Sequence, residues 1–208
     1  MVRLTTAHYY TPSGRCIQKP YEDGIEDYRT DYQKRMENGE MFHADSISFP
    51  DSLKYKTLGS GRTVYGGGGI MPDIFVPLDT SLLYRYYNRL QRNNIVYNYI
   101  LDYIDHNRER ISREYPTFED FKQHFVPGDE MIGAIVEEGI KADIPRDQES
   151  IDFTRNTIKK EMKAFIARDI YAKDYFYQVY NEDDTTILKA LDLINNPKSF
   201  KQLLIPAE

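Results

Sequence analysis

The chain changes character after Pro77, and this change constrains the fold more than any other feature of the sequence. Glycine is scarce from residue 80 onward, and apolar residues recur at the three- and four-residue spacing that one face of a helix requires. The first such set is Leu82, Leu83, Tyr86 and Leu90, and the second is Val96, Tyr99, Ile100, Tyr103 and Ile104. The pattern predicts a helical domain over residues 80–208.

Further helices are predicted within that domain. Thr117 opens the sequence T-F-E-D, which resembles a capping box with aspartate in place of the usual glutamate. Amphipathic patterns predict helices over residues 128–142, 148–180, 185–194 and 199–204. In the longest of these, Glu161 lies with Arg155, Lys159, Lys160 and Lys163 off the apolar stripe. Such a run of charges predicts a solvated face, and the tyrosines of the helices are expected to be half-buried.

Residues 1–79 have the composition of a small β-rich region. Residues 2–11 are rich in strand formers and lead into the turn sequence T-P-S-G, and residues 66–77 join four glycines to a short apolar run with two prolines. We expect strands in both places, with the glycines allowing close approach of neighbouring backbones.

These two segments carry a family resemblance. The sequence L-T-T-A-H-Y-Y-T-P-S-G-R-C-I-Q at residues 4–18, followed by G-I-M-P-D-I at residues 69–74, resembles the region that follows the catalytic motifs of carboxy-terminal processing peptidases, also called tail-specific serine proteases. Two linked motifs are more specific than either alone.

The resemblance implies that the catalytic groups lie outside this sequence. In the family, the serine nucleophile and the lysine base both precede the strand in which this chain begins, and so does a peptide-binding module. We therefore expect Met1 to be an internal methionine or an artificial start, and the chain to be an inactive carboxy-terminal fragment. The residues that carry over are Tyr9, Tyr10 and Arg15, which would shape the wall of the substrate cleft or simply hold the strand and turn.

Residues 19–65 depart from the family pattern, because its members pass almost directly from the first motif to the second. Within this insertion, residues 25–37 predict a surface helix that ends at Asn38-Gly39. Residues 55–58 and 62–65 are two short β-rich runs around Gly59-Ser60-Gly61. A three-residue loop with glycine between such runs predicts a hairpin.

Charge and hydropathy exclude several classes of protein. The net charge of -6 and the isoelectric point near 5.3 offer no general attraction to nucleic acid or to anionic membranes. No apolar run approaches the roughly 20 residues that span a bilayer. One cysteine, Cys16, forms no internal disulfide. The family resemblance, by contrast, implies a location outside the cytoplasm, in the periplasm or envelope.

A search for further chemistry within the chain is negative. His8, His43, His106 and His124 are scattered, so we expect no metal site, and no cofactor motif is present. Ser13 and Lys19 could be imagined as a catalytic pair, but neither matches the catalytic motifs of the family, and serine is common in turns.

The predicted fold class is α+β, with a small β-rich remnant of a protease core at residues 1–79 and a helical domain at residues 80–208. The function implied by the resemblance is that of a serine endopeptidase that cuts proteins near their carboxy termini, with a protein or peptide as substrate. A second interpretation is a helical protein-binding or assembly module without enzymatic activity, able to form homo-oligomers. A third is a carbohydrate-binding protein, although it would lack tryptophan.

Overall fold

The computed structural model describes residues 2, 4, 6–78 and 81–204. The chain separates into two compact units. The first consists of Met1–Asp79 and Lys189–Glu208, and the second is Thr80–Leu188. The predicted domains also divide between Asp79 and Thr80. Residues 189–208 were predicted as part of the helical domain, but they group with the first unit.

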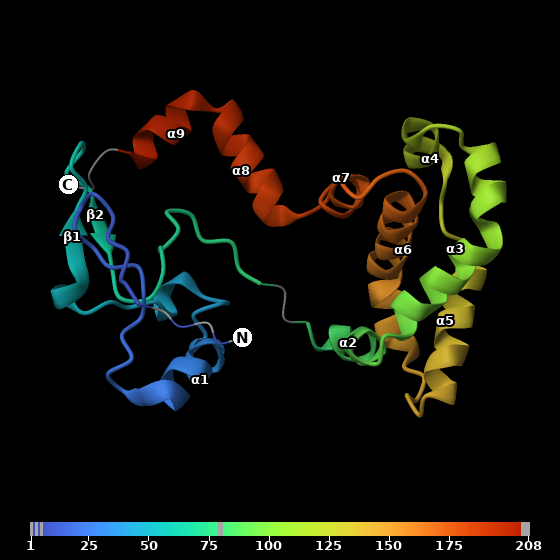
Figure 1. Cartoon of the computed structure of the whole chain (residues 1–208), viewed down its shortest axis with the longest axis horizontal. Coiled ribbons are helices and arrows are strands. Elements are labelled where there is room, and N and C mark those ends of the chain that lie inside the picture. The colour runs from blue at the N-terminus through green and yellow to red at the C-terminus, as the bar shows by residue number, and fades with distance from the viewer. Residues whose placement is uncertain (1, 3, 5, 79–80, 205–208) are drawn as a thin grey trace. The chain divides into compact units, whose positions relative to one another are not determined.

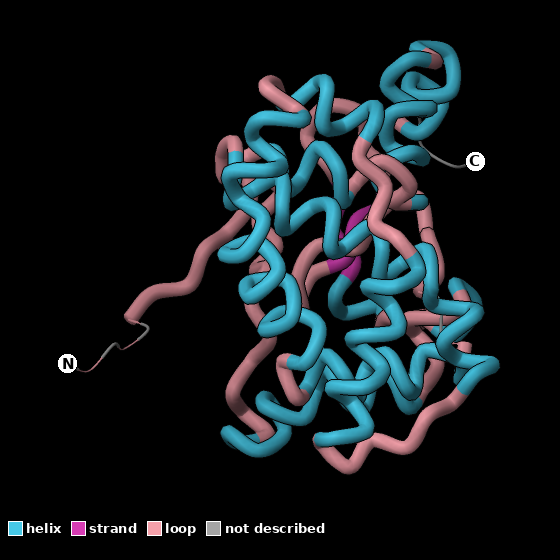
Figure 2. Tube along the Cα trace, turned by 90° about the vertical axis from the view of Figure 1, so that its right-hand side faces the viewer, coloured by secondary structure: helices cyan, strands magenta, loops and turns pink. Residues whose placement is uncertain are grey.

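The first unit contains one helix, a two-stranded sheet and two short 3₁₀ turns before residue 79, within its described residues (Figure 2). In order these are α1 (Gly24–Glu37), 3₁₀ turns at Ala44–Ser46 and Asp51–Leu53, β1 (Lys54–Lys56) and β2 (Thr63–Tyr65). The strands are antiparallel, with Tyr55 opposite Val64. The predicted surface helix and hairpin are thus confirmed.

The hairpin loop is longer than the predicted Gly59-Ser60-Gly61, because the strands end at Lys56 and resume at Thr63. The amide of Thr57 donates to the carbonyl of Arg62 at 2.9 Å, and Gly61 adopts a φ of 68°. Glycine reaches this left-handed region without a steric penalty, which explains its place in the loop.

The strands predicted at residues 2–11 and 66–77 are wrong for the residues that the structure describes. Between residues 6 and 11, Tyr10 alone makes a β-bridge, to Cys16, and the described part of 66–77 contains no strand. A strand needs a neighbour to receive its backbone hydrogen bonds, and no described segment pairs with residues 6–9. Pro72 and Pro77 also lack the amide that a sheet would use. Residues 1, 3 and 5 lie outside the described part.

The second unit is built from helices. They follow a 3₁₀ turn at Leu82–Tyr84 and are α2 (Arg85–Arg92), α3 (Ile95–Glu114), α4 (Phe118–His124), α5 (Asp129–Lys141), α6 (Gln148–Ile170) and α7 (Tyr175–Tyr180). α8 (Thr185–Asn195) begins in this unit, and α9 (Pro197–Leu203) follows it.

Helix α6 is the centre of the second unit. It packs against α2, α3, α4, α5 and α7, and Figure 1 shows it beside α3 and α5. Its buried stripe includes Ile158, Met162 and Ile166, each at most 1% exposed. The helical periodicity of the sequence therefore identified the core-facing side of this helix correctly.

The helix predicted over residues 148–180 is interrupted. α6 ends at Ile170 and α7 begins at Tyr175, and the Tyr171 hydroxyl donates to the carbonyl of Tyr115 at 2.6 Å. The break lets α7 fold back against α6, where Val179 is 2% exposed. Burial of apolar side chains on both pieces favours this return over one continuous helix.

The predicted cap at Thr117 is confirmed. The Thr117 hydroxyl accepts from the amide of Asp120 at 3.2 Å and donates to the Asp120 carboxylate at 2.6 Å. Several tyrosines of these helices are half-buried against the core, as expected; they are Tyr87, Tyr99, Tyr103, Tyr115, Tyr171, Tyr175 and Tyr180. Over the described ranges, no helix has both the length and the apolar character that crossing a membrane requires.

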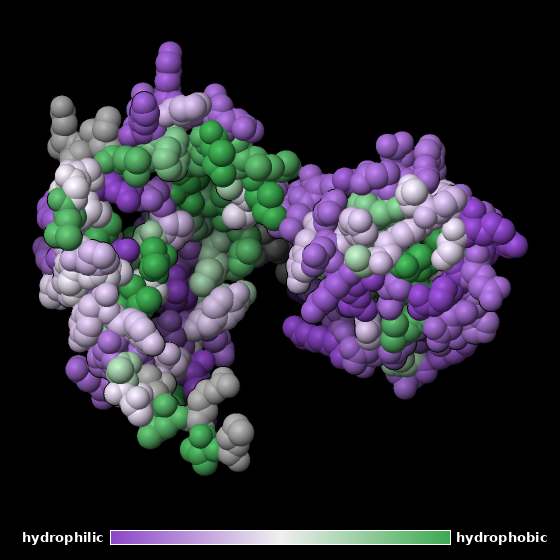
Figure 3. Space-filling view, turned by 45° about the horizontal axis from the view of Figure 1, so that its top comes forward, coloured by the Kyte–Doolittle hydropathy of each residue, from purple (hydrophilic) through white to green (hydrophobic). Residues whose placement is uncertain are grey.

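Helix α8 carries apolar side chains that remain exposed. Ile187, Leu191 and Ile194 follow one side of the helix at four- and three-residue spacing and are 36%, 48% and 67% exposed. Figure 3 shows hydrophobic side chains gathered on the face that carries α8 and α9. An amphipathic helix normally buries such a stripe, so α8 presents an apolar surface.

Candidate functional site

The two segments that resemble the protease family lie in contact. The amide of Gly67 donates to the carbonyl of Cys16 at 3.0 Å, and that of Gly69 donates to the carbonyl of Ile17 at 2.6 Å. Gly67 and Gly69 have φ values of 83° and 100°, which favour glycine. The glycine run therefore allows a close approach to residues 16 and 17, although not as part of a regular sheet.

The turn of the first motif is held by local hydrogen bonds. The amide of Gly14 donates to the carbonyl of Thr11 at 2.8 Å, and the amide of Thr11 donates to the carbonyl of Arg15 at 3.0 Å. The hydroxyls of Thr11 and Ser13 lie 2.9 Å apart. Ser13 thus has the role in the turn that its sequence context favours.

The three residues predicted for the cleft wall are not equivalent. Tyr9 and Tyr10 are 79% and 64% exposed, so their rings are free to contact another molecule. Arg15 is half-buried, and its Nη1 donates to the carbonyl of Tyr65 at 3.1 Å. Within the described residues, its Nε is buried without a hydrogen-bond partner. Arg15 therefore ties the first motif to the end of β2, and the contribution of all three residues to a cleft stays a prediction.

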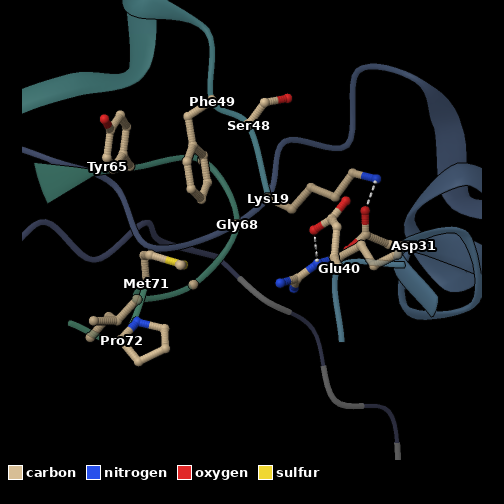
Figure 4. A pocket seen from close by; sticks show the side chains of 13 residues that line it. Lys19, Asp31, Glu40, Ser48, Phe49, Tyr65, Gly68, Met71 and Pro72 are labelled. Atoms are coloured by element: carbon tan, nitrogen blue, oxygen red, sulfur yellow. Dashed lines mark hydrogen bonds and ion pairs between the residues drawn. The ribbon is translucent and has the colours of Figure 1, made fainter. Parts of the chain in front are cut away.

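A pocket of about 410 Å³ lies beside this junction (Figure 4). Gly67, Gly68, Gly69 and Pro72 form one side of it, and Phe49 and Tyr65 stack with ring centroids 4.5 Å apart at another. The pocket thus combines the backbone of residues 67–69 with side chains from residues 19–65.

The charged groups of this pocket are paired with one another. Lys19 Nζ lies 2.6 Å from Asp27 Oδ2 and 2.7 Å from Asp31 Oδ1, and Arg35 Nε lies 2.9 Å from Glu40 Oε2. The hydrogen bond from Lys19 lowers the pKa of Asp27 to about 2, and the same bond raises the pKa of Lys19. Lys19 is consequently held as a cation and does not contact Ser13, which leaves a Ser13–Lys19 catalytic pair without geometric support.

A second polar group lies in the interior of the helical unit. Glu161 of α6 is 7% exposed, which contradicts the solvated face predicted for it. The Tyr87 hydroxyl donates to Glu161 Oε2 at 2.9 Å, and the Gln91 amide donates to the same oxygen. Burial raises the pKa of Glu161, although these two hydrogen bonds oppose the shift. Gln91 follows Tyr87 by four residues, so the two side chains lie on one side of α2. This spacing is the sequence signal that could have predicted a polar partner shared by both.

No group of three or more histidine, cysteine, aspartate or glutamate side chains is arranged to hold a metal ion within the described residues. Two polar features of the described residues are thus the motif junction with its pocket and the Tyr87–Gln91–Glu161 group.

One family model matches part of the chain. A model described as a family of unknown function, DUF8443, matches residues 86–172, which lie within the second unit. No curated protein and no solved structure matches the chain.

Proposed function

We propose that this chain forms the carboxy-terminal part of a serine endopeptidase of the carboxy-terminal processing class, and that the serine nucleophile and lysine base belong to a preceding segment. The observation that carries the proposal is the pair of backbone hydrogen bonds from Gly67 and Gly69 to Cys16 and Ile17. The two resembling motifs are about 50 residues apart in sequence, and their contact is what adjacent parts of one protease core require.

The apolar residues of the first unit also support the proposal. Val2 and Leu4 are 92% and 78% exposed, and Tyr9 and Tyr10 are exposed beside them. All buried apolar side chains of the described residues lie between Tyr86 and Val179. Among its described residues this segment pairs only at Tyr10, with Cys16, and buries no apolar side chain. A segment of this kind, rich in strand formers, is suited to joining a sheet supplied by another part of the protein.

In the proposed enzyme, residues 6–10 lie beside the active-site cleft. Tyr9 and Tyr10 line the cleft, and Arg15 holds the turn through its hydrogen bond to the Tyr65 carbonyl. The substrate is a protein or peptide, and the enzyme works outside the cytoplasm.

The test compares this chain with a longer one that includes the preceding coding sequence. We expect the chain alone to leave an unstructured protein uncleaved and to remain unlabelled by a small serine-directed probe. The longer protein should cleave and be labelled, and both activities should disappear when the serine of its small-residue motif is changed to alanine. Cleavage by the present chain that is abolished by Ser13→Ala would contradict the proposal.

The apolar stripe of α8 favours a second candidate function, that of an assembly module in which two copies pair through this helix. Light scattering across a concentration series should then show a dimer that Ile194→Asp disrupts. Leu58→Asp is the matched control, because Leu58 is 78% exposed in the hairpin loop, far along the sequence from α8. A monomer at every concentration would exclude this candidate.

A further inference from the structure

The second unit contains a basic pocket that the proposed function does not use. It has a volume of about 490 Å³ and lies between α2 and the start of α6. Arg85, Tyr86 and Arg89 line it from α2, and Arg146, Asp147 and Gln148 line it from the α6 side. Figure 1 shows α2 close to the end of α6 where that helix begins.

Two of the arginines have no internal partner. Arg85 and Arg89 lie four residues apart, so they share one side of α2. Neither guanidinium makes a hydrogen bond or an ion pair with any described residue, and both side chains are exposed. Like charges at this spacing destabilise a helix. An anion between them would remove that repulsion.

Arg146 is oriented by an amide of the pocket lining, and its charge also helps to lower the pKa of Asp152 on the first turns of α6. Its Nε and Nη2 donate to Gln148 Oε1 at 3.0 and 2.6 Å. Because an amide oxygen carries no charge, the guanidinium keeps its positive charge and its Nη1 remains available. The single acidic group of the lining, Asp147, caps α6 by accepting from the amide of Ser150 at 3.1 Å. Three arginines and one aspartate give the pocket a net charge of about +2 by the usual ionisation states.

Tyr86 provides an observation of a different kind. It is 3% exposed, and its hydroxyl is buried with no hydrogen-bond partner among the described residues. Burial raises the pKa of Tyr86, so the hydroxyl keeps its proton and can donate it. A buried donor without an acceptor is unfavourable. The hydroxyl lies against α5 beneath the pocket lining, so the donors that face the pocket are the arginines.

The space around this hydroxyl depends on Gly139 of α5. A Cβ atom at Gly139 would lie 3.3 Å from the Tyr86 hydroxyl and 2.8 Å from Leu90 Cδ2. The second distance is shorter than real Cβ contacts allow. Glycine at this position therefore lets α2 approach α5 closely and sets the depth at which the Tyr86 hydroxyl lies.

We propose that this pocket binds a phosphate dianion, either as free phosphate or as a phosphate monoester. Guanidinium groups match phosphate oxygens through paired N–H donors. The charge of a dianion balances the net charge of the lining, and the phosphate oxygens suffice for the three arginines. A carboxylate has one charge and two oxygens, which would leave part of this set unpaired.

The experiment titrates the full chain with inorganic phosphate and, separately, with methyl phosphate at pH 8 and constant ionic strength, with calorimetry as the measurement. Saturable binding of either ligand is expected, and the tighter of the two identifies the form that the pocket takes. Acetate is expected to bind at least tenfold more weakly, in line with the loss of about one charge-assisted hydrogen bond.

Variants locate the site. Arg85→Gln and Arg89→Gln should each weaken phosphate binding by about tenfold. Arg92→Gln is the matched control, because Arg92 lies on the same helix but does not line the pocket. Absence of saturable binding to both phosphate ligands would overturn the proposal, as would equal losses in Arg89→Gln and Arg92→Gln or tighter binding of acetate than of phosphate.

Discussion

The Tyr87 hydroxyl lies 2.9 Å from Glu161 Oε2 and joins α2 to α6 through a hydrogen bond inside the helical unit. Gln91 donates to the same carboxylate oxygen and also to the Tyr87 hydroxyl, the latter at 2.8 Å. Burial raises the pKa of both Tyr87 and Glu161. The carboxylate therefore has two neutral donors and no cation to balance its charge within this group.

This arrangement predicts a dependence of stability on pH. Because the folded pKa of Glu161 is raised, the folded state binds the proton more tightly than the unfolded state does. The free energy of unfolding should fall as the pH rises from the ordinary glutamate pKa of about 4.3 through the raised folded value. Glu161→Gln should stabilise the protein by about 1 kcal/mol at pH 8 and flatten this slope. Urea unfolding at pH 4 to 8 measures both effects, and Glu109→Gln on the exposed face of α3 is the control.

Removing the Tyr87 hydroxyl, a donor to Glu161, should have the opposite effect on stability. Tyr87→Phe should lower the free energy of unfolding at pH 8 by about 1–3 kcal/mol, because Glu161 would stay buried and lose a hydrogen bond. In the Glu161→Gln background the same change should be less harmful. A double-mutant cycle measures this coupling, and additive effects would show that the two side chains act independently.

Two glycines of α5 should respond in opposite ways to alanine. Gly139→Ala should destabilise the protein, since its Cβ would lie 2.8 Å from Leu90, which is fully buried. Gly133 has no atom within 4 Å of the equivalent position, so Gly133→Ala should stabilise α5 by up to about 1 kcal/mol. Thermal unfolding of the pair tests the close approach of α2 to α5, and similar shifts in both variants would argue against it.

A second pair of glycines, Gly67 and Gly68, tests the motif junction in the same way. Gly67 has a φ of 83° and its Cβ would lie 2.8 Å from Leu53, whereas Gly68 has open space and no positive φ. Gly67→Ala should therefore loosen the contact with Cys16, and Gly68→Ala should not. Hydrogen exchange at the amides of Gly67 and Gly69 reports the change; equal exchange in the two variants would mean that the junction does not depend on this backbone conformation.

The cap of α4 is open to a simpler test. Thr117→Ala should lower the free energy of unfolding by about 1 kcal/mol, because the amide of Asp120 loses its acceptor. Thr117→Ser keeps the hydroxyl and should retain most of the stability. Equal losses in the two variants would assign the effect to the methyl group instead.

The sequence predicted those elements whose stability is local. The hairpin at Gly59-Ser60-Gly61 and the cap at Thr117 depend on neighbouring residues and were confirmed. The predicted strand at residues 2–11 is absent from the described residues, because a strand depends on a pairing partner that the sequence pattern does not reveal. The break after Ile170 depends on the tertiary contacts of α7.

The same distinction between local and tertiary causes applies to the candidate site residues. The turn role of Ser13 could be deduced from its neighbours, whereas the burial of Glu161 could not. Glu161 lies off the main apolar stripe of α6, and only the packing of α2 reveals that this side of the helix is covered. Likewise, Arg85 and Arg146 share a pocket although 61 positions separate them in sequence, because the start of α6 lies against α2.

The hydrogen bond from Gly67 to Cys16 brings the two ends of residues 19–65 together. The chain leaves this junction just after Cys16 and returns to it at Gly67. Lys19 is tied to Asp27 and Asp31, both within the same segment. A change in the length of a segment that departs and returns at one point need not reroute the chain on either side. Residues 19–65 should therefore tolerate insertions and deletions at their exposed turns while the junction stays in place.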